Sequence, residues 1–152
     1  MGPDWGLLAD TGMRIALAYL LALPIGWDRE REGHTGVRTF PLVAIASCGY
    51  VLLGGVAEAG LAEGQSRIIQ GLITGIGFIG AGAILKGQGS VYGSATAASI
   101  WNTGVVGAAV ALGRFEIAVI LSAINLLTLR LLPKLKSHIV EERTNGEPGK
   151  DN

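Results

Sequence analysis

The charged side chains that could do chemistry are gathered in one short segment that begins at Asp28 and ends at Thr39. Carboxylates such as those of Glu30 and Glu32 are the ligands that Mg²⁺ prefers in proteins. Arginines alternate with these acids, and the i,i+3 spacing of Arg29 with Glu32 favours ion pairs along a helix end. The segment therefore allows two interpretations: a cation site, or a solvated helix end whose charges mark the membrane topology.

The other reactive residue types do not form a site in the sequence. His34 and His138 have no partner at metal-ligand spacing, and Cys48 lies alone in an apolar run, which is typical of a small buried residue. No nucleophile–base pair is visible, so we expect no enzymatic activity. The formal net charge is zero, which does not favour nucleic-acid binding. We expect no cofactor, with Mg²⁺ left open as a ligand.

Residues 75–80, GIGFIG, match the dinucleotide-binding fingerprint letter for letter. That fingerprint requires a preceding strand and an acidic residue about 20 positions further on. No Asp or Glu occurs between Glu63 and Glu116. We therefore attribute these glycines to helix packing.

Long apolar segments with few charges must position the charged residues. Only 16% of the residues are charged, against about a quarter in soluble domains. A bilayer core of about 30 Å is crossed by roughly 17–25 apolar residues in a helix. The sequence thus predicts an all-α integral membrane bundle of five transmembrane helices. The predicted spans are residues 11–27, 40–57, 68–85, 94–112 and 115–132.

The segments outside these spans are short. Residues 1–10 carry no Lys or Arg, so they do not look like a cleavable signal peptide. Pro133 is expected to close the fifth span. Residues 133–152 read as a charged tail with a short helical extension followed by disorder.

Basic residues near the spans predict the orientation. One side of the five-span arrangement has many of them, including Arg29, Arg31, Arg38, Lys86, Arg130, Lys134, Lys136 and Arg143. The other side has only three, each at a helix end: Arg14, Arg67 and Arg114. We predict the N-terminus outside and the C-terminus in the cytoplasm, with the Arg14 side chain snorkelling to the lipid headgroups.

Glycine makes up 24 of the 152 residues, roughly twice its usual share of about 7%. In lipid, small residues let helix backbones approach closely and so carry the packing. The predicted third span has small residues on several faces, so we expect it in the centre of the bundle. The glycines expected to pack are Gly71, Gly75, Gly77, Gly80 and Gly82 in that span and Gly107 in the fourth.

Two amides, Asn102 and Asn125, lie near the middle of the fourth and fifth spans. We expect them to form hydrogen bonds between helices, an interaction of about 0.6–2 kcal/mol, rather than to line a permeation path. No acidic residue falls in the predicted hydrocarbon region, which counts against a pump or coupled transporter.

Three stretches together resemble a known family. They are GWDREREG at residues 26–33 with GVRT at 36–39, TGIGFIGAG at 74–82, and GSATAASIW at 93–101. In this order and spacing they resemble the MgtC/SapB family of bacterial inner-membrane proteins, over about residues 11–132. The family's polar signature falls on Asp28, Arg29, Glu30, Arg38, Thr39 and Thr96.

The resemblance implies a multi-pass protein of the bacterial inner membrane. It implies a non-enzymatic regulator of membrane energetics or ion homeostasis linked to magnesium limitation, with transport of Mg²⁺ or another small ion as the alternative. The expected partners are the lipid bilayer, another membrane complex such as the ATP synthase, and a second copy in a homodimer. Many relatives carry a cytoplasmic domain after the last span, and we expect its role to be absent here or supplied by another protein.

Overall fold

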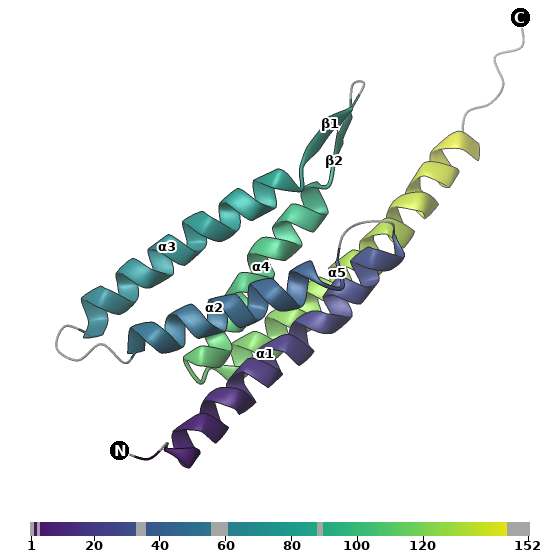
Figure 1. Ribbon diagram of the computed structural model, residues 1–152. Helices are drawn as coiled ribbons and strands as arrows, with labels where there is room; N and C mark the ends of the chain where they lie inside the picture. Colours follow the sequence, from purple (N-terminus) through teal and green to yellow (C-terminus); the bar gives the residue numbers. More distant parts are fainter. Residues whose placement is uncertain (1, 3, 33–35, 56–60, 88–89, 146–152) are drawn as a thin grey trace, which may run out of the picture.

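The structure is a computed structural model that describes residues 2, 4–32, 36–55, 61–87 and 90–145. The described residues form five α-helices and one short two-stranded hairpin (Figure 1). The helical class predicted from the sequence is thus confirmed. The helices are α1 (Trp5–Arg31), α2 (Thr39–Gly55), α3 (Leu61–Gly82), α4 (Ser94–Ala111) and α5 (Phe115–Asn145).

The hairpin between α3 and α4 was not predicted. It pairs β1 (Leu85–Gly87) with β2 (Ser90–Tyr92) in antiparallel register. Gly93, at a φ of 82°, then turns the chain into α4, and any Cβ at this position would overlap the carbonyl oxygen of Ala83. Only glycine fits such a left-handed position against a neighbouring backbone.

Two helices are longer than their predicted spans. The Asp4 side chain caps α1 by accepting the backbone N–H groups of Gly6 and Leu7 at 3.0 and 3.1 Å, so α1 begins well before residue 11. α5 runs through Pro133 to Asn145, so the helix extends beyond the predicted fifth span, as the expected helical extension of the tail requires. Proline lacks one backbone donor, and the leucine- and lysine-rich flanks are good helix formers that continue the helix.

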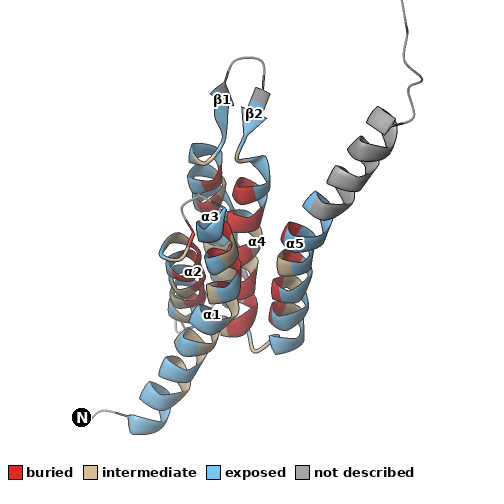
Figure 2. Ribbon diagram, turned by 90° about the vertical axis from the view of Figure 1, so that its right-hand side faces the viewer, coloured by how far each residue is buried: buried red, intermediate tan, exposed pale blue. Residues whose placement is uncertain are grey.

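α4, and not α3, lies in the centre of the bundle. α4 packs against α1, α2, α3 and α5, whereas α3 packs mainly against α4 and α2 at the edge (Figures 1 and 2). The prediction that the glycine-rich α3 is central is therefore wrong. Glycine content alone does not show whether the space beside a glycine is filled.

The packing of individual glycines explains the difference. In the described part of the chain, a Cβ at Gly71, Gly75, Gly77 or Gly82 would meet nothing within 4 Å. Gly80 does lie close to α4, with the carbonyl oxygen of Ala97 3.3 Å from where a Cβ would be.

α2 and α4 make the closest contact in the core. At Gly107 a Cβ would overlap the carbonyl oxygen of Ala44 on α2. At Gly104, which faces α3, it would overlap the side chain of Ile76. The predicted packing role of Gly107 is confirmed by this contact. Ser99 and Thr103, on the same ridge of α4, are also buried.

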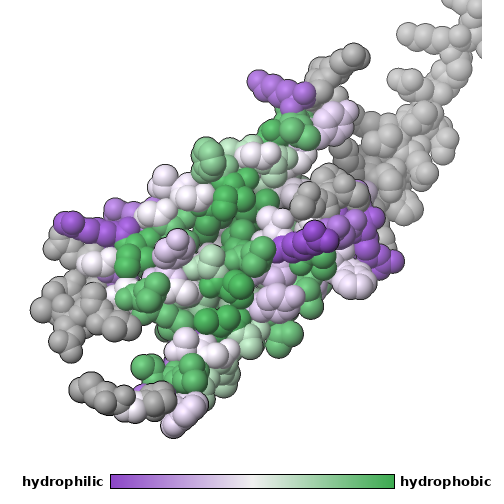
Figure 3. All heavy atoms as spheres, viewed as in Figure 1, coloured by the Kyte–Doolittle hydropathy of each residue, from purple (hydrophilic) through white to green (hydrophobic). Residues whose placement is uncertain are grey.

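The outer surface of the bundle is apolar. Large hydrophobic side chains such as Leu20, Leu53 and Phe78 are more than half exposed, at 60%, 71% and 83%. In Figure 3, hydrophobic residues cover the middle of the visible face, and hydrophilic ones gather toward its ends. Two described helices, Trp5–Arg31 and Phe115–Pro133, are long and apolar enough to cross a membrane. Water-soluble monomers rarely expose so much contiguous apolar surface, so this is the surface of a membrane protein.

The contact between α2 and α4 predicts different effects for two glycines. Gly107→Ala should lower the free energy of unfolding by about 1–3 kcal/mol, because the new methyl group is forced against Ala44. Gly75→Ala, where the space is open, should leave it unchanged or raise it by up to about 1 kcal/mol. Unfolding of the purified variants in mild detergent measures both, and equal effects would refute the packing described for α4.

Candidate functional site

A cluster of four charged residues, which we call the charged clasp, joins the end of α1 to α5. It consists of Asp28, Arg29, Glu32 and Arg130. The two carboxylate oxygens of Asp28 accept from different arginines: Oδ1 from Arg130 Nε at 2.9 Å and Oδ2 from Arg29 Nη2 at 3.1 Å. Arg29 Nη2 also lies 2.8 Å from Glu32 Oε2. The clasp thus pairs two acids with two bases and fixes α5 against α1.

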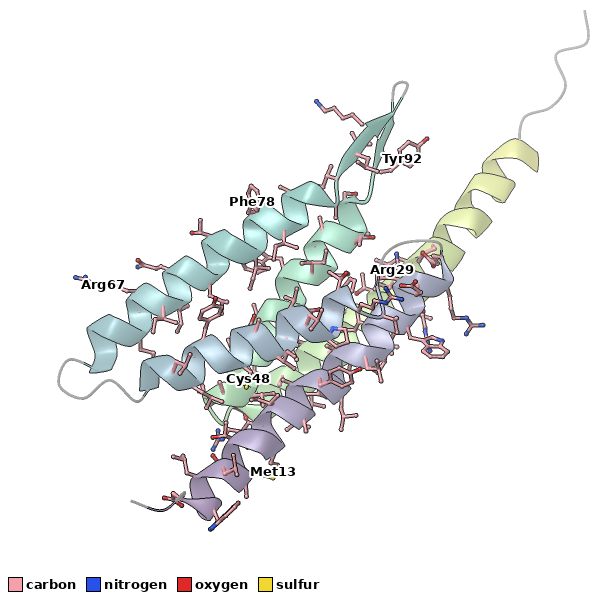
Figure 4. The ribbon with its side chains drawn as sticks, viewed as in Figure 1. Met13, Arg29, Cys48, Arg67, Phe78 and Tyr92 are labelled. Atoms are coloured by element: carbon pink, nitrogen blue, oxygen red, sulfur yellow. The ribbon has the colours of Figure 1, made fainter. Side chains whose placement is uncertain are left out.

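Arg29 is the enclosed member of the clasp, only 4% exposed, and Figure 4 shows it where α1 and α5 meet. A buried guanidinium is tolerated only when it is paired. Its Nε has no hydrogen-bond partner within the described part of the chain. The i,i+3 pairing of Arg29 with Glu32 predicted from the sequence is confirmed, while Asp28 pairs with Arg29 and Arg130 and not with Arg31.

Glu30 holds the turn that leads into α2. One carboxylate oxygen, Oε2, accepts the backbone N–H groups of Gly36 and Val37 at 2.9 and 3.1 Å. The turn packs so tightly on α1 that a Cβ at Gly36 would overlap the carbonyl oxygen of Gly26. Gly26 and Gly36, one from each of the GWDREREG and GVRT stretches, therefore permit backbone contact between α1 and this turn.

These contacts set the protonation of the two acids, which lie beyond the predicted span. Burial raises the pKa of Asp28, but the hydrogen bonds and charges of Arg130 and Arg29 together lower it by more, so its pKa lies below the ordinary value. The backbone N–H groups of Gly36 and Val37 lower the pKa of Glu30. Both carboxylates are therefore ionised at neutral pH.

Three further predicted site residues lie outside the clasp. Arg38 is exposed, and its charge helps to lower the pKa of Glu30; Thr39 is the first residue of α2. Thr96 is buried in the first turn of α4, and no hydrogen bond among the described residues joins it to Asp28, Arg29 or Glu30. Arg130, which completes the clasp, lay outside the predicted cluster, because its pairing with Asp28 depends on how α1 and α5 cross.

The amides Asn102 and Asn125 join α4 to α5 by hydrogen bonds, as predicted. Asn125 accepts from the Ser99 hydroxyl through Oδ1 at 2.8 Å, and Asn102 donates to the carbonyl oxygen of Leu121 at 3.2 Å. Ser122 adds a bond from α5 to α1, donating to the carbonyl oxygen of Leu21 at 2.7 Å. Each of these side chains thus has a hydrogen-bond partner on a neighbouring helix.

Arg14 is held by partners at the end of the bundle, and its snorkelling to the lipid headgroups stays a prediction. Its Nη1 donates to the carbonyl oxygens of Val110 and Ala111, at 3.3 and 3.1 Å, in the last turn of α4. Its Nε donates to Asp10 at 2.8 Å. A cation at this position satisfies carbonyl groups that the helix end leaves open and complements the negative end of the helix dipole.

The described residues contain no group of three or more His, Cys, Asp or Glu side chains that could hold a metal ion. Fold and site together define a helical membrane protein with a charge-paired clasp at one end of the bundle. Comparison with known proteins agrees: the model of the MgtC family matches residues 15–138, and the chain belongs to this family. The resemblance found in the sequence is thus confirmed.

Several curated relatives are similar over most of the chain. SrpB of Synechococcus elongatus is 37% identical, with 88% of this chain and 79% of SrpB aligned. YhiD of Escherichia coli K12 is 30% identical, with 90% of this chain and 66% of YhiD aligned. MgtC of Brucella abortus is 36% identical, with 68% of this chain and 43% of that protein aligned. The chain thus spans less than half of the Brucella protein. No solved structure matches the chain.

The clasp predicts a loss of stability in acid. Because the pKa of Asp28 is lowered in the folded protein, its stabilisation is present above the unfolded value of about 4 and is lost as the pH falls through the folded value. Asp28→Asn should therefore lower the free energy of unfolding by about 1 kcal/mol at pH 7. Below about pH 4 the free energies of the variant and the native protein should converge.

Thermal unfolding in detergent at several pH values measures this effect. Arg130→Gln removes the ion pair between Arg130 and Asp28 and should lose stability in the same pH-dependent way. Arg31→Gln, at an exposed neighbouring arginine, should unfold like the native protein. If the difference in unfolding temperature between Asp28→Asn and the native protein stays constant down to pH 3, the role of the ion pair is contradicted.

Proposed function

We propose that this chain is a multi-pass protein of the bacterial inner membrane that acts as a non-enzymatic regulator, linked to magnesium limitation, by associating with another membrane protein. The magnesium link comes from the family. Among the relatives, YhiD of Escherichia coli K12 has a name that suggests magnesium transport, and the Brucella relative is named MgtC.

We propose that all five helices cross the membrane, and for α1 the position of two tryptophans supports this. Trp5 and Trp27 are both mostly exposed, at 72% and 57%. Their separation along the helix corresponds to roughly 33 Å at the helical rise, close to the bilayer core of about 30 Å. Tryptophan prefers both membrane interfaces. The excess of basic residues near the clasp supports a cytoplasmic location for that end and an outside location for the N-terminus.

The observation that carries the proposal is the open glycine face of α3. Gly71, Gly75 and Gly82 share one face of the helix, and a Cβ at any of them would meet nothing within 4 Å in the described chain; Gly71 and Gly75 border a groove of about 500 Å³ beside α2. Phe78 projects from the same face, and Figure 4 shows it pointing away from the bundle. Glycine is a poor helix former, so its abundance where no helix of the same chain packs is explained by contact with a helix of another protein.

The charged clasp argues against the alternative of Mg²⁺ transport. A Mg²⁺ site needs carboxylate oxygens and water in an octahedral arrangement. Here Asp28 is bound by two guanidinium groups, and Oε2 of Glu30 by two backbone N–H groups. A cation would have to displace these donors, so the clasp is better suited to hold helices together than to admit an ion.

The partner we propose is a membrane complex with a lipid-facing helix that can pack on α3; the family resemblance makes the ATP synthase the first candidate. A second copy of the chain could use the same face. No cofactor is required, because the proposed action is binding and not catalysis.

The double variant Gly71→Leu/Gly75→Leu tests this function. It should insert and unfold like the native protein, because both positions are open, yet lose its effect on growth in low magnesium and its partner in mild-detergent purification. The matched control is Gly12→Leu on α1, at another exposed glycine with open space beside it. This variant should keep the effect on growth and the partner.

Normal growth and partner recovery in the double variant would refute the role of α3.

Purified protein in liposomes with a magnesium-sensitive dye tests the alternative, transport of Mg²⁺. We expect no Mg²⁺ flux above that of empty vesicles. A flux that Asp28→Asn abolishes would favour transport.

A further inference from the structure

The end of the bundle opposite the charged clasp contains a cavity of about 430 Å³. Met13, near this cavity on α1, and Arg29 mark the two ends of the bundle in Figure 4. The cavity, which we call the outer cavity, is open to the surface and is lined by residues of four helices and of the turn between α4 and α5. Its lining includes Asp10, Arg14, Leu52, Gln65, Leu112 and Gly113.

Arg14 is held rigidly in the wall of the outer cavity. Nε is committed to Asp10 and Nη1 to two carbonyl groups of α4, and the guanidinium lies 5.9 Å from the centre of the Phe115 ring. Its third nitrogen, Nη2, has no partner among the described residues and is not one of their buried unpartnered atoms. Arg14 thus brings a fixed positive charge with unused N–H donors to the wall of the outer cavity.

Acceptors lie in the same cavity. Asp10 uses only Oδ2 for Arg14, and its side chain is 46% exposed, so Oδ1 can still accept. The half-buried Gln65, on the facing wall from α3, adds an amide oxygen. The outer cavity therefore presents a positive donor group and a negative acceptor group side by side.

This pairing of charges discriminates among ligands. A simple anion would meet the Asp10 carboxylate and the negative end of α4. A divalent cation would meet the Arg14 guanidinium and find one carboxylate, fewer oxygen ligands than it needs. A zwitterion satisfies both groups, because its anionic part can bind Arg14 while its cationic part binds Asp10.

The rest of the lining selects a lipid. Val51, Leu52 and Leu112 make one side of the cavity apolar. The cavity also lies where α2 and α4 end, at Gly55 and Ala111, which is the depth of the headgroups in the proposed membrane placement. A ligand with a zwitterionic head and acyl chains matches this combination of polar groups, apolar wall and depth.

We propose that the outer cavity is a binding site for phosphatidylethanolamine. The phosphate accepts from Arg14 Nη2, and the primary ammonium donates to Asp10 Oδ1 and to the Gln65 amide oxygen. Phosphatidylcholine brings a positive charge but no N–H donor, and phosphatidylglycerol has no positive charge, so neither can donate a charge-assisted hydrogen bond to Asp10 and Gln65.

Native mass spectrometry of the full chain, released from detergent with each lipid in turn, tests the site. We expect phosphatidylethanolamine to be retained about tenfold more than phosphatidylcholine or phosphatidylglycerol, equivalent to about 1.4 kcal/mol. Glycerophosphoethanolamine, the same head without acyl chains, should bind far more weakly. Equally tight binding of this soluble head would overturn the lipid as ligand and assign the cavity to a free zwitterion.

Asp10→Asn should abolish the preference for phosphatidylethanolamine while keeping an oxygen acceptor for Arg14, so that the unfolding temperature stays near that of the native protein. Gln65→Leu should reduce the preference without touching Arg14. The matched control is Glu116→Gln, an exposed carboxylate paired with Arg114 and outside the cavity lining, which should keep the preference. Equal retention of all three lipids by the native protein, or an unchanged preference in folded Asp10→Asn, would overturn the proposal.

Discussion

The rest of the structure depends on the backbone contact between α2 and α4. Gly107 lies against the carbonyl oxygen of Ala44, and any larger residue would separate the two helices. In a membrane, lipid chains are as apolar as leucine, so helices associate through close packing and hydrogen bonds. This contact makes α4 the central helix, with α1 and α5 beside it and α3 at the edge. The position of α3 leaves its glycine face open for the association that we propose.

The polar groups of the bundle follow from the same constraint, because an unsatisfied polar group is costly in hydrocarbon. Asn125 and Ser99 pair in the middle, and Arg14 binds the last carbonyl groups of α4 at one end. At the other end the charged clasp pairs its acids with arginines. The bundle thus has a neutral, internally satisfied core, with charge confined to two polar ends of different character: one closed by ion pairs, the other open to a zwitterionic ligand.

The sequence predicted the features that depend on local composition. The apolar segments marked the helices, the i,i+3 spacing found the pair of Arg29 and Glu32, and the mid-span amides were correctly expected to join helices. It could not predict features that depend on how helices cross. Glycines that pack and glycines that lie open look alike in a sequence, so α3 was placed in the centre. Arg130 is far from Asp28 in the chain, and nothing local pairs them.

Labelling of single cysteines in intact cells tests the central claim, a bundle that crosses the membrane with the charged clasp inside and the outer cavity outside. In a Cys48→Ser background, Glu116→Cys should react with a membrane-impermeant maleimide added to whole cells. Glu32→Cys and Tyr92→Cys should react only after the inner membrane is permeabilised. Labelling of all three positions from the same side would contradict the account.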